Sequence, residues 1–154
     1  MKLSLIKASL RLLAAVAIPL AAASCAYLPF QLEAPASPLV GSWTTQDHNQ
    51  VTFRPDAVIV TPDKGQATTM GPSDCNGVYK LQYGVMDTGA LEKSFPSQPD
   101  FASKLRQLLV KPEYPVADVT CDQGGTTYLM LDERQMLAVY RDSGVGGTEA
   151  FSRL

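Results

Sequence analysis

Residues 117–153 read ADVTCDQGGTTYLMLDERQMLAVYRDSGVGGTEAFSR, and this stretch decides the fold. It alternates apolar and polar residues in short β-prone segments, with turn-forming residues between them. We expect strands at 117–121, 126–131, 135–141 and 148–153, separated by turns at 122–125, 132–134 and 143–147. The last three strands have the spacing of an up-and-down antiparallel meander.

The residues before this stretch carry further strand patterns and one helical pattern. Strand-like alternation occurs at 40–45, 50–53, 58–61, 66–70 and 78–83. An apolar stripe at helical spacing is formed by Phe101, Leu105, Leu108 and Leu109. It predicts one inserted helix at about residues 98–110. The domain is therefore predicted to be mainly β, a small antiparallel barrel or two-sheet sandwich of about seven or eight strands.

The first 24 residues have the layout of an export signal. Lys2, Lys7 and Arg11 supply their positive charge, no acidic residue is present, and an apolar run follows at 12–23. The run is shorter than the roughly 20 apolar residues that a membrane-spanning helix needs. We therefore expect residues 1–24 to be a cleaved signal peptide.

Small residues precede Cys25 in the segment AAASC at 21–25. This segment resembles the lipobox of bacterial lipoproteins, although Ala22 stands where the motif usually has Leu. The resemblance implies cleavage before Cys25 and acylation of its thiol, which would anchor the protein to a membrane through lipid. The alternative is an ordinary secretory signal cut near Ala23, which would leave Cys25 as a free thiol.

The cysteine count favours lipidation. The chain has three cysteines, so an exported protein would keep one unpaired thiol if Cys25 were unmodified. Lipidation of Cys25 leaves Cys75 and Cys121 as an even pair in an oxidising compartment. We therefore expect a Cys75–Cys121 disulfide.

The residues after Cys25 bear on location and domain organisation. Ala26 follows the cysteine, whereas Asp there retains lipoproteins in the inner membrane of enteric bacteria. The resemblance thus implies anchoring in the outer membrane, with the domain on the periplasmic face. Residues 26–38 contain three prolines, which suits a tether, and 39–154 is enough for one domain.

The charge of the mature chain narrows the class of partner. Removal of three basic residues with the signal leaves 10 Lys and Arg against 15 Asp and Glu, so the formal net charge is about −5. An excess of negative charge disfavours a nucleic-acid partner. An envelope protein or a cell-wall component is compatible with it.

Gly41-Ser42-Trp43 begins the first expected strand. It resembles the G-x-W signature of lipocalin-like barrels, in which the Trp packs at the barrel base beneath an arginine from a late strand. Arg141 or Arg153 would be that arginine here. The segment at 74–79 also resembles the G-C-N then G-x-Y pattern of the META envelope domains.

Few residues suggest catalysis or metal binding. His48 is the single histidine, in an expected turn at 46–49, and no second histidine or free cysteine completes a usual zinc set. The serines lack the G-x-S-x-G motif, and the glycines at 124–125 and 144–147 read as turn residues. We expect no catalytic residues, no metal and no cofactor.

Three functions are compatible with these patterns. The first is a non-catalytic envelope lipoprotein that binds a protein or envelope component, including an inhibitor-type role. The second is a lipocalin-like carrier, which needs a cavity of several hundred cubic ångströms within the sheet. The third is a cell-wall glycan enzyme, which needs two carboxylates about 5 to 10 Å apart in one cleft.

Mass analysis of the mature N-terminus tests the lipobox assignment. We expect a chain that begins at Cys25 and carries three acyl chains, because the thiol is the expected lipid attachment site. A Cys25→Ser variant is the control, and it should lose the added mass. An unmodified Cys25 in the native protein would refute the assignment.

Overall fold

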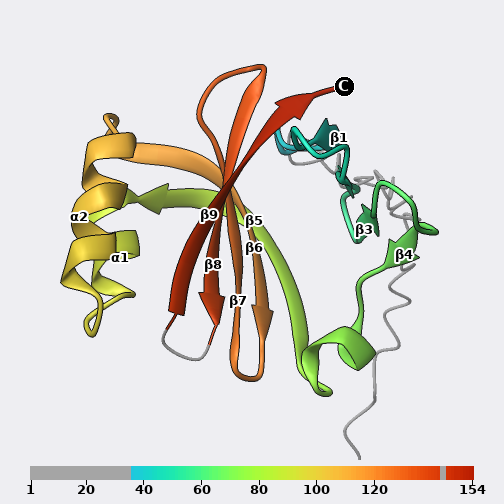
Figure 1. Cartoon of the computed structure of the whole chain (residues 1–154), viewed down its shortest axis with the longest axis horizontal. Coiled ribbons are helices and arrows are strands. Elements are labelled where there is room, and N and C mark those ends of the chain that lie inside the picture. The colour runs from blue at the N-terminus through green and yellow to red at the C-terminus, as the bar shows by residue number, and fades with distance from the viewer. Residues whose placement is uncertain (1–35, 143–144) are drawn as a thin grey trace, which may run out of the picture. The chain divides into compact units, whose positions relative to one another are not determined.

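The computed structural model describes residues 36–142 and 145–154, so the expected signal, Cys25 and most of the tether lie outside the described residues (Figure 1). The described chain forms one nine-stranded antiparallel sheet with two short α-helices. The strands are β1 (Gly41–Thr44), β2 (Gln50–Phe53), β3 (Val58–Thr61), β4 (Thr68–Thr69), β5 (Tyr79–Asp87), β6 (Glu113–Cys121), β7 (Gly124–Met130), β8 (Gln135–Asp142) and β9 (Val145–Arg153). The helices are α1 (Thr88–Lys93) and α2 (Pro99–Leu108), and a 3₁₀ turn, η1, spans Pro72–Cys75.

The sheet is continuous and curls into a half-barrel. Its strand order is β4-β3-β2-β1-β9-β8-β7-β6-β5, so the chain's first and last strands are neighbours in the middle of the sheet. β1 pairs with β9 through Trp43 opposite Arg153 and Thr44 opposite Ser152. The edges are β4 and β5. The fold is thus the predicted mainly β class, with one curled sheet in place of two packed sheets.

Strands β6, β7 and β8 have buried residues on both faces, since consecutive buried residues along a strand point to opposite faces. On β7, Tyr128 packs with residues of β1–β3, whereas Leu129 packs with the two helices. Figure 1 shows α1 and α2 together on one side of the β6–β9 strands. The helices contribute Leu91 and Leu105, both fully buried, to this second cluster.

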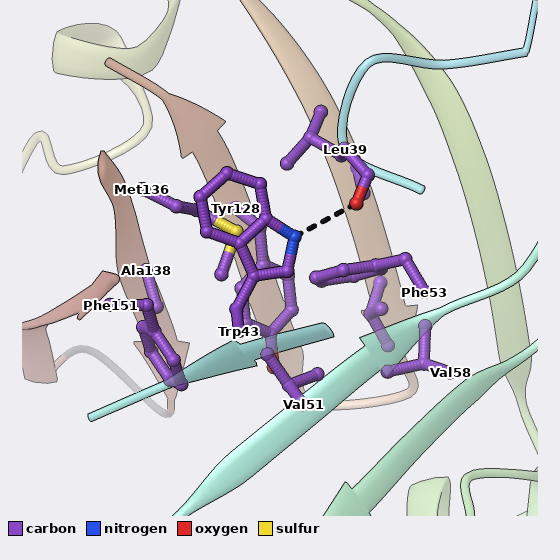
Figure 2. Close-up of a cluster of buried hydrophobic side chains, with 11 residues drawn as sticks. Leu39, Trp43, Val51, Phe53, Val58, Tyr128, Met136, Ala138 and Phe151 are labelled. Carbon is purple, nitrogen blue, oxygen red and sulfur yellow. Dashed lines mark hydrogen bonds between the residues drawn. The ribbon is translucent and has the colours of Figure 1, made fainter. Parts of the chain in front are cut away.

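Trp43 lies at the centre of the cluster on the concave face (Figure 2). Its side chain is fully buried, and its Nε1–H donates to the Leu39 carbonyl oxygen at 2.9 Å. Phe53 meets Tyr128 edge-to-face with ring centroids 4.9 Å apart. Trp43 therefore connects the segment before β1, through its hydrogen bond to Leu39, with the strands whose side chains pack around its ring.

The helical prediction was incomplete. α1 was missed, because six residues are too few to show an apolar period; Asp87 caps its N-terminus by accepting from the Ala90 N–H at 2.9 Å. α2 lies within the predicted 98–110 and ends at Leu108, since Leu109 is extended. The strands β5 and β6 also run further than their patterns indicated, to Asp87 and from Glu113.

Two glycines that we expected in turns lie within strands. Gly125 is part of β7 with a φ of +152°, and a Cβ there would meet the Val119 carbonyl oxygen at 2.2 Å. Gly146 is part of β9, and a Cβ there would lie 2.5 Å from the Phe101 ring of α2. Both positions need glycine because another segment approaches closely.

Cys75 of η1 and Cys121 of β6 form a disulfide across 46 residues of sequence. The bond joins the segment before β5 to the end of β6, so it encloses both helices and β5 in one covalent loop. Cys75 is buried, with an exposed fraction of 2%. A cross-link that closes a loop of this length lowers the entropy of the unfolded chain, which stabilises the fold by about 4 kcal/mol.

Replacement of both cysteines tests this contribution. We expect the Cys75→Ala/Cys121→Ala variant to lose about 4 kcal/mol of unfolding free energy in guanidinium denaturation, because its unfolded chain is no longer constrained. The oxidised wild type and its chemically reduced form provide the control pair. Equal stability of reduced and oxidised protein would contradict the assigned role.

Candidate binding groove at the open edge of the sheet

The predicted structural residues Gly41, Trp43 and Arg153 come together where β1 joins β9. The Arg153 guanidinium carbon lies 4.7 Å from the centroid of the Trp43 ring, within cation–π range. Its Nη2 also donates to the carbonyl oxygens of Pro38 at 2.6 Å and Val40 at 3.4 Å. A Cβ at Gly41 would be 3.8 Å from this nitrogen.

Arg141 lies elsewhere, so Arg153 is the arginine at the tryptophan. The Arg141 Nη2 contacts Asp118 Oδ1 at 2.6 Å, and Thr127 donates to the same oxygen at 2.5 Å. Both partners are strand residues of β6 and β7. This cluster links side chains of β6, β7 and β8, and in the described structure the Arg141 Nε is buried within it without a hydrogen-bond partner.

An apolar groove of about 430 Å³ lies between β5 and the first strands. Tyr83, Gly84 and Val85 of β5 form one wall. The other wall contains Ala36, Ser37 and Val40, which precede β1, and Pro55 of the β2–β3 turn. The groove is therefore built by segments that are far apart in sequence, on either side of the gap that keeps the half-barrel open.

The β5 wall is a sheet edge nine residues long. β5 pairs with β6 in a register that places Val85 opposite Pro115. The Thr88 N–H donates to the Pro112 oxygen at 2.9 Å, one step beyond this ladder, so even-numbered residues of β5 bond to β6. The odd-numbered residues then direct their backbone N–H and C=O groups away from β6.

Among the described residues, no hydrogen bond engages the backbone N–H groups of Leu81, Tyr83 and Val85. The other edge strand, β4, has two residues, a length at which natural sheets avoid edge pairing. A long sheet edge whose backbone groups are unpaired, as those of β5 are within the described residues, is a template for a further strand. The groove thus combines unpaired backbone groups with an apolar lining.

Tyr83 bridges the gap at one point. Its hydroxyl donates to the Arg54 carbonyl oxygen at 2.5 Å, across to the β2–β3 turn. Burial, followed by the nearby Tyr79 and Asp56, raises the pKa of Tyr83 to about 12. The hydroxyl therefore stays protonated at neutral pH and fixes the width of the groove beside it.

A second hollow, of about 300 Å³, lies at the disulfide and is polar. Its lining includes Asp74 and Tyr140. The Asp74 carboxylate accepts from the Gly71 N–H at 2.9 Å, and the Tyr140 hydroxyl donates to the Glu149 carboxylate. Burial, followed by this carboxylate, raises the pKa of Tyr140. These polar groups serve the fold, so we place the candidate site at the apolar groove.

Sequence reasoning did not identify the groove. Val85 is 66% exposed, an unusual value for an apolar strand residue, but its place on a sheet edge depends on how β5 pairs.

His48, the single histidine, is exposed in the β1–β2 turn with a φ of 63°. In the part of the chain that the structure describes, no three His, Cys, Asp or Glu residues are grouped closely enough to hold a metal.

The concave face is filled by side chains. Trp43, Phe53, Val58 and Met136 on this face are each at most 1% exposed. The apolar groove lies beside this filled cluster, because Tyr83, which packs against the cluster, also lines the groove.

The chain matches no protein-family model, no curated protein and no solved structure. No helix within 36–142 or 145–154 combines the length and the apolar character needed to cross a membrane.

Tyr128 gives the core a pH-dependent stability. Burial raises its pKa from 10.0 to about 12, so only the unfolded chain ionises readily between these values. The stabilisation is complete below pH 10 and is lost as the pH rises towards 12, by about 3 kcal/mol at most. In denaturation at pH 9 and pH 12, Tyr128→Phe should therefore lose less stability than the wild type. An equal loss in both proteins would contradict this burial.

Proposed function

We propose that this protein is a non-catalytic lipoprotein of the outer membrane, held by lipid on Cys25, whose domain binds a polypeptide partner on the periplasmic side. The groove between β5 and the segment before β1 is the binding site. One observation carries the proposal: the groove presents an exposed apolar side chain, Val85, beside unpaired backbone groups on β5.

The lining supports a partner that contributes apolar side chains. Val40, Pro55 and Val85 offer it hydrocarbon surface. Burial of such surface contributes about 25 cal/mol per Å². The lining residues that the structure describes carry no charge, so we expect the affinity to depend weakly on salt.

The position of the groove in the chain supports a partner near the membrane. Ala36, which lines the groove, is 11 residues after Cys25. A segment of that length spans at most about 40 Å when fully extended. A lipid on Cys25 would thus confine the groove to the space just beneath the membrane, where envelope proteins and their inhibitors act.

Photocrosslinking in intact cells tests the proposed function. A photoreactive residue at position 85 should yield one dominant crosslinked protein, because Val85 faces the partner. The same residue at position 110 is the matched control, since Val110 is 85% exposed and lies outside the groove lining. A groove substitution in the same chain, Val40→Asp, should abolish the crosslink at 85.

Equal crosslinking from positions 85 and 110 would contradict the proposal. So would a crosslink from position 85 that persists unchanged with Val40→Asp. Folding of each variant is checked by its disulfide and its circular dichroism.

A further inference from the structure

We infer that the partner docks as an added β-strand, antiparallel to the free edge of β5, with alternate apolar side chains in the groove. This inference rests on the proposed function and names its mode of recognition. The occupant is an extended segment of another polypeptide, of about five residues, with uncharged aliphatic or small side chains at every second position.

The unpaired backbone groups select a peptide. Leu81, Tyr83 and Val85 direct N–H and C=O groups to the edge, at a spacing that another strand's backbone matches. A lipid chain could fill the apolar lining, but it would leave these donors and acceptors without partners. An extended peptide satisfies both the edge and the lining.

Pro115 supports the assignment of the free edge independently. It lies opposite Val85 in β6, and a proline is tolerated in a sheet where no ladder hydrogen bond needs its nitrogen. Val85 and Pro115 therefore form a pair that does not exchange hydrogen bonds, so the Val85 N–H points away from β6.

The groove favours one strand over a second copy of the domain. It has walls on both sides, with Tyr83 and Val85 on one and Val40 and Pro55 on the other. The β5 edge of a second copy would bring its own β6 along, and β6 would meet the far wall. A single extended segment carries no such neighbour.

The orientation follows from the sheet. All strand pairs in the described sheet are antiparallel, and residues directly opposite in such a pair share a face. A partner residue hydrogen-bonded to Val85 would therefore point its side chain to the same face as Val85, into the groove. Its neighbours would point to the opposite face.

A designed peptide tests the inference. The probe is a fluorescein-labelled heptapeptide, GTVTVTG, measured by fluorescence anisotropy against the full mature chain in detergent. Its valines should enter the groove and direct their N–H groups to β5. N-methylation of the two valines should therefore weaken binding at least about tenfold, because it removes the paired donors. N-methylation of the threonines, whose N–H groups face away, is the matched control and should change the affinity less than about threefold.

Two protein variants separate backbone pairing from apolar contact. Val85→Pro removes the N–H group that faces the edge and breaks no hydrogen bond to β6. It should therefore lower the affinity for the probe at least about tenfold. Val85→Ala keeps the N–H and should weaken it less. Equal affinities of these two variants, equal affinities of the two methylated peptides, or no probe binding would overturn strand addition.

The outcomes separate this inference from the proposed function. A crosslink at position 85 that is lost with Val40→Asp, together with unchanged binding of the Val85→Pro variant, would mean that the partner uses the groove through side chains alone. If a second copy of the protein occupied the edge, it would compete with the probe, and the fraction of probe bound would decrease at high protein concentration. This result too would overturn the inference.

Discussion

Arg153 lies across the Trp43 ring, and this contact joins the two halves of the sheet. β1 pairs with β9 over two residue pairs, and in the backbone pairing of the described sheet β2, β3 and β4 connect to β5–β9 only through β1. The Arg153 guanidinium also binds the Pro38 carbonyl at 2.6 Å, which fixes the chain just before β1. Because Trp43 is fully buried, the joint is anchored in the same core that fills the concave face.

The β1–β9 pair lies in the middle of the sheet, and the two edges of the half-barrel remain unpaired with each other. β4 and β5 do not pair, and the described structure spans the gap with side chains, among them Tyr83 reaching Arg54. One edge is two residues long and the other nine, so the free pairing capacity lies almost entirely on β5. The candidate groove is the direct product of this asymmetry, since its walls are β5 and the segment that Arg153 holds in place.

Most of the fold was predictable from local patterns, and the site was not. The meander from β6 to β9 follows two-residue alternation and turn chemistry, both of which are local in sequence. The sequence did not predict α1, because six residues are too few to show a helical period. It placed Gly125 in a turn, because the close approach of Gly125 to Val119 is a tertiary contact that the local pattern does not reveal. The groove brings Val40 and Val85 to one place, 45 residues apart in sequence, and only the pairing of the strands decides that they meet.

Site-resolved amide hydrogen exchange along β5 in the free protein tests the open edge most directly. The account predicts alternation, with slow exchange at Lys80, Gln82, Gly84 and Met86, whose N–H groups bond to β6, and fast exchange at Leu81, Tyr83 and Val85. Uniformly slow exchange along the strand would show that the edge is already paired, and it would contradict the account.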